Sequence, residues 1–190
     1  SRTGWSSEFG YEIFLLNSND GDEVYETLMQ EGKDLGLHPG HTSTIRRIEG
    51  GMLSYHSDMD INTNPFELDL DKFIDLEGSF NFIGKDALIK IKKSGIKRKQ
   101  VGLIIECEKF NGPNTKKWDI FNGNEKIGHV TSAVYSPRLK QNIALAMVNI
   151  SYTYIHTHLK VKINTNLINA VITEKPFFDP NKLIAKEKTN

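Results

Sequence analysis

The second half of the chain is a series of short apolar segments separated by turn residues. Residues 101–106 form a continuous apolar run, and Asn122-Gly123-Asn124 has the chemistry of a tight β-hairpin turn. Further segments with strand patterns lie at 118–121, 126–135, 143–150, 152–163 and 167–173. Many short strands at roughly regular spacing are typical of a barrel or a sandwich. The pattern therefore predicts a C-terminal antiparallel β-barrel or jelly-roll domain over residues 100–183.

The first half of the chain contains helical patterns. Apolar residues at helical spacing predict three helices, at residues 23–35, after 41–44 and at 86–93. Gly36 ends the first helix, because glycine is the commonest residue just past a helix C-terminus. Thr42 or Ser43 can cap the second helix, and Gly50-Gly51 stops it.

Extended patterns also occur in this half. Residues 9–16 are rich in aromatic and branched side chains and predict a strand. Residues 66–71 alternate strictly between apolar and polar, which predicts a half-exposed strand or extended arm, continued by 73–76. The basic run 92–100 is interpreted as a solvated linker. We therefore predict an α+β protein with a first domain over residues 1–95.

Composition narrows the class of protein. The 24 basic and 24 acidic residues balance, which argues against a nucleic-acid or anionic-membrane surface as the main activity. We find neither an apolar run near the ~20 residues of a spanning helix nor a signal-peptide pattern, so we expect a cytoplasmic protein. The single cysteine, Cys107, excludes an intrachain disulfide.

Glu12 is the residue most in need of explanation, because it lies between Tyr11 and Ile13 in the predicted strand 9–16. It is either solvated or buried against hydrogen-bond donors, since an unpaired buried charge is too costly. A ligand rich in N–H groups would supply such donors. Trp5 and Phe14 are either core residues or walls of a pocket for a flat ring or a cation. Glu12 and Phe14 are two apart and share a face of the predicted strand, and we expect Trp5 to reach the same cavity from the preceding bend.

Arginine is scarce, with only five residues of this type in the chain. Arg46 and Arg47 lie with Glu49 on the second short helix. They form either a local structural ion pair or a site in which one guanidinium points at a carboxylate or phosphate of a ligand. His156 and His158 share a strand face, but no cluster of further ligands accompanies them, so we interpret them as solvated and predict no metal site.

Several motifs, taken in order, carry a resemblance. Residues 2–13, RTGWSSEFGYEI, resemble R-T-G-Y-T-G-E-D-G-F-E-I of the folate-binding family of the glycine cleavage T-protein. Residues 47–51 are similar to R-L-E-A-G, and 82–88 to D-F-I-G-K-E-A-L. Further similar stretches lie at 64–67, 128–137, 142–148 and 176–179. The resemblance covers nearly the whole chain.

The resemblance implies a fold and a cofactor. It implies a partial folate-binding α/β domain, the C-terminal half to two-thirds of a three-domain ring, whose missing part carries the other pocket wall. The implied ligand is tetrahydrofolate, with Glu12 gripping the pterin and Trp5 and Arg47 as further cofactor-binding residues. Phe14, Ser54 and Tyr55 are the implied contacts of the second substrate, and no catalytic residue is assigned.

Within the family, residues 4–12 and 43–56 look most like the dimethylsulfoniopropionate demethylase branch. That branch implies a tetrahydrofolate-dependent methyltransferase, which moves a methyl group from a sulfonium to N5 of the folate. Two departures weaken individual contacts: Ser43 replaces an arginine that touches folate in T-proteins, and Phe14 replaces a tyrosine. The expected partner is a small-molecule methyl donor, with a possible homodimer, and the fragment alone is expected to be inactive.

Two alternatives stay open. One is an aminomethyltransferase of the glycine cleavage system, which would require a lipoyl carrier protein as its partner. The other is a non-catalytic folate-binding relative, although the K-G-C-Y-x-G-Q-E motif of such proteins is absent.

Overall fold

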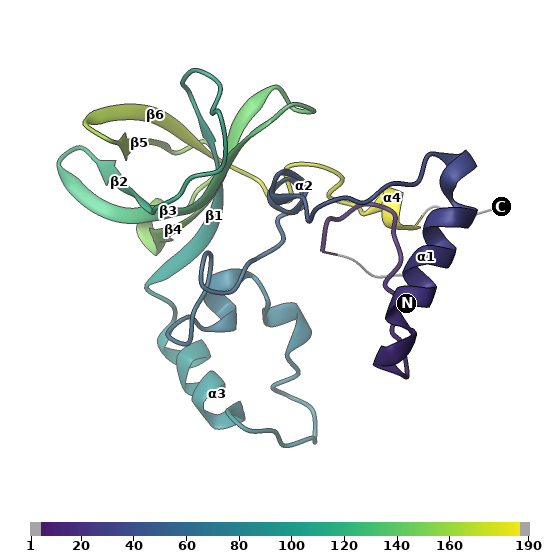
Figure 1. Cartoon of the computed structure of the whole chain (residues 1–190). Coiled ribbons are helices and arrows are strands. Elements are labelled where there is room, and N and C mark those ends of the chain that lie inside the picture. The colour runs from purple at the N-terminus through teal and green to yellow at the C-terminus, as the bar shows by residue number, and fades with distance from the viewer. Residues whose placement is uncertain (1–4, 187–190) are drawn as a thin grey trace.

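The computed structural model describes residues 5–186, and its largest unit is a closed barrel of six antiparallel strands (Figure 1). The order around the barrel is β1-β4-β3-β2-β5-β6. The strands are β1 (Arg98–Ile105), β2 (Trp118–Asn122), β3 (Glu125–Ser136), β4 (Gln141–Asn149), β5 (His158–Ile163) and β6 (Asn166–Thr173). The prediction of a C-terminal β-barrel is thereby confirmed.

Alternating apolar side chains fill the barrel. Val101, Leu103 and Ile105 of β1 belong to one buried cluster with residues from every other strand. At Gly128 the backbones of β3 and β4 come so close that a Cβ would lie 2.2 Å from the carbonyl oxygen of Met147. The barrel wall therefore requires glycine at this position.

Two barrel boundaries differ from the sequence prediction. β1 begins at Arg98, inside the run predicted as a solvated linker, because Arg98 pairs with Asn149 at the start of the β1–β4 ladder. Its guanidinium also pairs with the buried carboxylate of Glu67 at 2.9 Å. β5 begins only at His158, because the chain before it forms a short 3-10 helix, η5 (Ile150–Tyr152). The side chain of Asn149 caps that helix by accepting from the N–H of Ser151.

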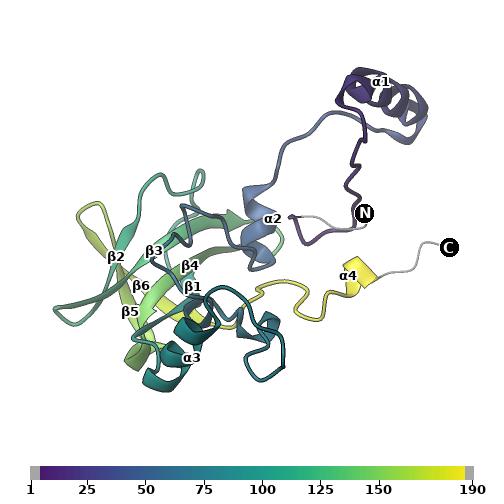
Figure 2. The same ribbon diagram turned by 90° about the horizontal axis from the view of Figure 1, so that it is seen from below.

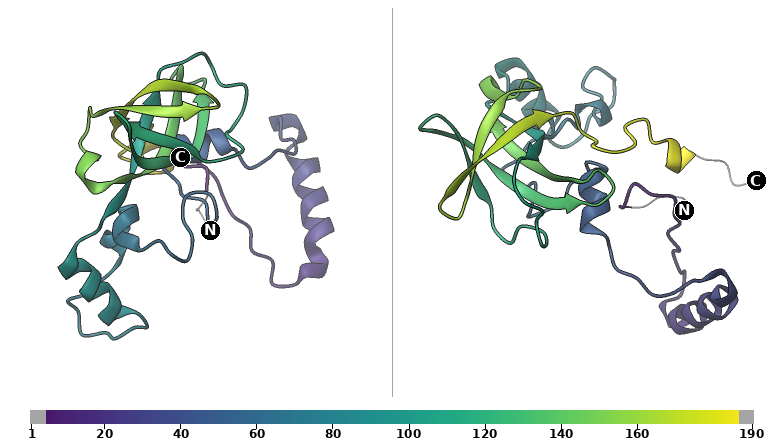
Figure 3. Two further views of the ribbon diagram at one scale, coloured as in Figure 1. Left: turned by 90° about the vertical axis from the view of Figure 1, so that its left-hand side faces the viewer. Right: turned by 90° about the horizontal axis from the view of Figure 1, so that it is seen from above.

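The predicted helices are present. They are α1 (Gly21–Glu31), α2 (Thr44–Glu49) and α3 (Lys85–Ser94), with a short α4 (Leu183–Lys186) near the C-terminus. 3-10 turns precede and follow α1, as η1 (Ser18–Asp20) and η2 (Lys33–Leu35), and Gly36 closes η2 in the left-handed conformation at φ 77°. α2 packs against β3 and β4, whereas α1 stands away from the barrel (Figures 1 and 2). Figure 3 shows the same separation from two further directions.

The predicted strand at 9–16 is wrong: the segment is extended but pairs with no strand in the described part of the chain. A strand needs a ladder partner to satisfy its backbone groups. Without one, its apolar side chains stay in solvent, and Phe14 and Leu16 are 75% and 108% exposed. α1 has no buried residue either, although its apolar residues follow the helical period. The helical period therefore correctly predicted α1 as a helix, but its apolar face does not pack against the barrel.

The predicted extended arm at 66–71 is also wrong, because these residues form 3-10 turns, η3 (Pro65–Leu68) and η4 (Asp71–Phe73). The side chain of Asn64 accepts from the N–H of Glu67, whose carboxylate accepts in return from the N–H of Asn64. This capping box and Pro65 at the first helical position override the alternating pattern. The predicted continuation at 73–76 fails for the same reason, since η4 ends at Phe73.

A buried ionic network joins α2 to the barrel. The guanidinium of Arg47 donates to Asp58 Oδ2 at 2.9 Å and to Ser132 Oγ at 2.8 Å. Asp58, 2% exposed, also accepts from the N–H of Ser54 and from the hydroxyls of Thr131 and Ser132. The β3–β4 register shifts between Val130 and Ser132, which marks a β-bulge. Neighbouring strand residues normally point to opposite faces, so the bulge explains how both hydroxyls reach one carboxylate oxygen.

Replacing Asp58 with Asn is expected to lower the free energy of unfolding by about 3–5 kcal/mol, because it leaves the buried Arg47 charge without its counter-ion. Urea unfolding measures the loss. Asp119→Asn is the control, since Asp119 pairs with Lys126 at 2.8 Å on the barrel surface. Its effect should stay within about 1 kcal/mol. Equal losses for the two variants would show that burial of the pair does not matter.

Candidate functional site

A depression of about 710 Å³ lies between the segment that precedes α1 and the start of α2. We call it the α2 pocket. It is lined by Trp5, Ser6, Glu8, Gly10, Tyr11, Glu12, Gly40, His41, Thr42, Ser43 and Arg46. Two segments about 30 residues apart in the chain thus form its walls.

The short helix α2 orients one wall of this pocket. The hydroxyl of Ser43 accepts from the N–H of Arg46 at 3.3 Å, so the predicted cap is confirmed. The helix buries Arg47, Ile48 and Glu49 toward the barrel and leaves Arg46 exposed at the pocket. Two consecutive residues of one short helix are therefore a structural arginine, Arg47, and an arginine that is open to a ligand, Arg46.

The opposite wall is held in place by three kinds of contact, with α2, with the residues directly after it and with the β3–β4 connection. The indole N–H of Trp5 donates to the carbonyl of Leu53 at 3.3 Å, and the guanidinium of Arg47 lies 5.4 Å from the indole ring centre. At Gly50, a Cβ would lie only 2.1 Å from the hydroxyl oxygen of Ser7, so glycine allows the segment to cross the end of the helix. The third contact is the ion pair of Glu8 with Arg138, at 2.7 Å.

Arg138 is the centre of a second charged cluster. Besides Glu8, its guanidinium reaches the buried carboxylate of Glu49 at 3.6 Å and lies 4.0 Å from the ring centre of Phe178. Glu49 in turn accepts from the hydroxyl of Ser136 at 2.5 Å. The pocket wall, α2, the β3–β4 connection and the C-terminal segment therefore meet at one side chain.

The structure separates the predicted site residues into two groups. Trp5 and Glu12 line the α2 pocket together, as expected. Phe14 does not line it, because without a paired strand its side chain extends into solvent. The expectation that Phe14 shares their cavity is thus wrong.

The other three predicted residues also lie outside the pocket lining. Arg47 is 5% exposed and donates to protein acceptors in the ionic network, so its geometry supports the structural alternative over a ligand contact. The N–H of Ser54 donates to Asp58 at 2.9 Å, and the half-exposed ring of Tyr55 meets the edge of His56. Their predicted substrate contacts stay predictions.

Arg46 and His41 line the pocket, although neither was assigned to the site from the sequence. The scarcity of arginine identified Arg46 as a candidate, yet nothing in the sequence distinguishes it from Arg47. Only the burial of one face of α2 does so. His41 carries no sequence signal beyond its position after the Pro39-Gly40 turn.

The α2 pocket combines an aromatic ring, carboxylates and a guanidinium. Trp5 and Tyr11 can contact a flat ring, and Glu12 can accept from ring N–H groups. Arg46 can bind a carboxylate or a phosphate at the helix side. In residues 5–186, no group of three His, Cys, Asp or Glu side chains could hold a metal ion. None of the helices described there has the length and apolar character to cross a membrane.

Two family models match the chain. The GCVT N-terminal domain matches residues 1–78, and the glycine cleavage T-protein C-terminal barrel domain matches residues 98–179. Curated relatives named aminomethyltransferase include those of Caldanaerobacter subterraneus subsp. tengcongensis, 37% identical over 184 residues, and Prochlorococcus marinus, 39% identical over 179 residues. These alignments cover 95% and 94% of this chain but 48% and 46% of the relatives. The chain thus spans about half the length of the curated relatives it matches.

A solved structure shares the fold. It is the glycine cleavage system aminomethyltransferase T from Bartonella henselae, with a TM-score of 0.84 and 22% sequence identity. The superposition covers 94% of this chain and 49% of that one. The predicted fold class, an α+β T-protein arrangement ending in an antiparallel barrel, is confirmed.

Replacing Arg138 with Met is expected to speed amide hydrogen exchange in residues 6–9 by a few-fold, because the partly exposed ion pair of Arg138 with Glu8 contributes up to about 1 kcal/mol. Exchange is followed by mass spectrometry of peptides. Arg98→Met is the matched control, since Arg98 pairs with Glu67 away from this segment. If exchange in residues 6–9 is unchanged by Arg138→Met, the cluster does not hold the pocket wall.

Proposed function

We propose that this chain is part of a folate-dependent aminomethyltransferase. It matches the GCVT N-terminal domain and, after it, the glycine cleavage T-protein C-terminal barrel domain. The observation that carries the proposal is the order of these two domains over residues 1–78 and 98–179. Relatives named aminomethyltransferase, 37% and 39% identical, support it. The whole protein would transfer a one-carbon unit from an aminomethyl donor, held on a lipoyl carrier protein, to tetrahydrofolate.

The α2 pocket is the proposed place for the folate. A pterin has ring N–H and amino groups, which the carboxylate of Glu12 would accept in a charge-assisted pair. Trp5 would contact the flat ring from the wall that carries Glu12. The contribution of these residues to catalysis would be to position the acceptor, which can lower a barrier by several kcal/mol without a general base.

Arg46 is proposed to contact the carboxylate end of the folate. Ser43 replaces the arginine to which the family resemblance assigns a folate contact. Arg46 lies three residues further on, one helical turn away, lines the same pocket and is exposed. Its guanidinium would therefore supply the charge that Ser43 lacks.

The sulfonium demethylase is the second candidate, supported by the motif in residues 43–56. The relatives favour the aminomethyltransferase over it. A sulfonium cation is best held by several aromatic faces, yet Phe14 is 75% exposed and does not line the pocket with Trp5.

A non-catalytic folate-binding relative would bind folate and transfer nothing.

Glu12→Gln is expected to weaken tetrahydrofolate binding by about tenfold or more, because the amide replaces a charged acceptor with a neutral one. Titration calorimetry with the 190-residue chain measures the affinity. Glu26→Gln on α1 is the control, because Glu26 is exposed and does not line the α2 pocket. Unchanged affinity in Glu12→Gln would show that Glu12 does not bind the pterin.

Product analysis distinguishes the candidate reactions. The protein, as its native host produces it, is incubated with tetrahydrofolate and either an aminomethyl-loaded lipoyl carrier protein or dimethylsulfoniopropionate. We expect methylene-tetrahydrofolate from the carrier protein and no methyl-tetrahydrofolate from the sulfonium. Methyl-tetrahydrofolate as the sole product would establish the demethylase, and folate binding without either product would favour the non-catalytic relative.

A further inference from the structure

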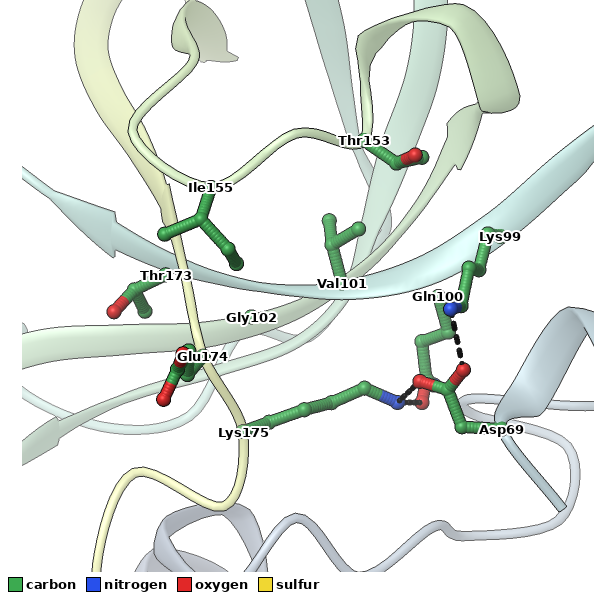
Figure 4. A pocket seen from close by; sticks show the side chains of 10 residues that line it. All are labelled: Asp69, Lys99, Gln100, Val101, Gly102, Thr153, Ile155, Thr173, Glu174 and Lys175. Carbon is green, nitrogen blue, oxygen red and sulfur yellow. Dashed lines mark hydrogen bonds and ion pairs between the residues drawn. The ribbon is translucent and has the colours of Figure 1, made fainter. Parts of the chain in front are cut away.

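A second cavity, of about 250 Å³, lies at the edge of β1 (Figure 4). We call it the β1-edge cavity. It is lined by Asp69, Lys99, Gln100, Val101, Gly102, Thr153, Ile155, Thr173, Glu174 and Lys175. None of these residues lines the α2 pocket, and the proposed function uses none of them.

The cavity exists because two neighbouring strands of the barrel separate. β1 pairs with β4 along its whole length, but it pairs with β6 only from Gly102, opposite Thr173, onward. After Thr173 the chain leaves the barrel wall, so the first half of β1 has an open edge. Thr153 and Ile155, from the connection before β5, border the gap on one side, and Asp69 borders it on the other (Figure 4).

Gln100 is the unexplained residue of this cavity. Its side chain is buried, with 1% exposure, and its Oε1 accepts from the ammonium of Lys175 at 3.2 Å. Lysine can only donate, so this contact identifies the amide atom beside Lys175 as the oxygen and the other atom as the nitrogen. That nitrogen, Nε2, is buried without a hydrogen-bond partner among the described residues. A buried donor without an acceptor costs about 1–3 kcal/mol and calls for a missing partner.

At Asp69 two ammonium groups meet one carboxylate, which leaves one positive charge in excess among these three groups. Lys99 and Lys175 share the carboxylate of Asp69, at 2.6 Å and 3.3 Å. Burial lowers the pKa of Lys175, Asp69 opposes this effect, and the nearby cations of Lys99 and Lys72 add to it. The carboxylate of Glu174 points away from this group (Figure 4). Each ammonium has three donors, so both lysines keep N–H groups for a further acceptor.

We propose that the β1-edge cavity binds a short aliphatic monocarboxylate. One carboxylate group would take the spare donors of Lys99 and Lys175 and, after a small rotation of the Gln100 side chain, supply the acceptor that its amide lacks. The single excess charge fits a monoanion better than a dianion such as phosphate. Ile155, which is 43% exposed, provides most of the apolar wall for the aliphatic body, and the barrel-core residue Val101 adds only its small exposed part. An inorganic anion would not use this wall.

Titration of the 190-residue chain with butyrate, at constant ionic strength set by chloride, tests the proposal. We expect millimolar binding, seen both by calorimetry and as amide shifts at Gly102 and Thr173 in nitrogen-15 spectra. Butyramide, inorganic phosphate and chloride should bind at least about tenfold more weakly. Equal binding of phosphate would reduce the site to a general anion site and overturn the proposal, as would the absence of butyrate binding.

Variants locate the site. Lys175→Met and Gln100→Leu are each expected to weaken butyrate binding about tenfold or more, while Lys162→Met, an exposed lysine of β5 outside the cavity, should leave it unchanged. If Lys175→Met or Gln100→Leu does not fold, Lys99→Met is measured instead, because Lys99 is more exposed. Unchanged affinity in folded variants of these cavity residues would overturn the assignment. The result is independent of folate binding, because the two cavities share no residue.

Discussion

The buried pair of Arg47 and Asp58 is the interaction on which the rest of the first half depends. Asp58 accepts from the Arg47 guanidinium, from a backbone N–H and from two hydroxyls of β3. Two charges taken out of water are tolerated only when such additional hydrogen bonds accompany their mutual attraction. Because the donors come from α2, from residues 52–58 and from the barrel, the pair sets how these parts sit together.

The α2 pocket follows from this arrangement. Once the buried face of α2 is fixed on the barrel, Arg46 must lie on the open face, since successive helical residues point about 100° apart. Trp5, held by Leu53 and by the Arg47 guanidinium, and Glu8, held by Arg138, then place the opposite wall. The pocket residues are therefore oriented by two guanidinium groups, those of Arg47 and Arg138, that do not themselves line the pocket.

The fold and the proposed activity rest on different observations. The barrel and its domain match support the T-protein fold directly. The aminomethyl donor, the lipoyl partner and folate itself come from relatives of which this chain spans about half. The observations behind the β1-edge cavity are independent of those for the fold and for the activity. They are the divergence of β1 and β6 and a buried amide in this chain.

The sequence by itself determined the elements whose signals are local. Regularly spaced apolar segments and the Asn122-Gly123 turn predicted the barrel, and the Ser43 cap and Gly50 delimited α2. Motifs indicated Trp5 and Glu12 as pocket residues. Only the tertiary structure decided which of Arg46 and Arg47 is buried, that residues 9–16 form no ladder in the described chain, and that Phe14 lies outside the pocket. The physical reason is that caps and turns are satisfied within a few residues. By contrast, a strand's hydrogen bonds and a buried charge's counter-ion come from residues far away in the chain.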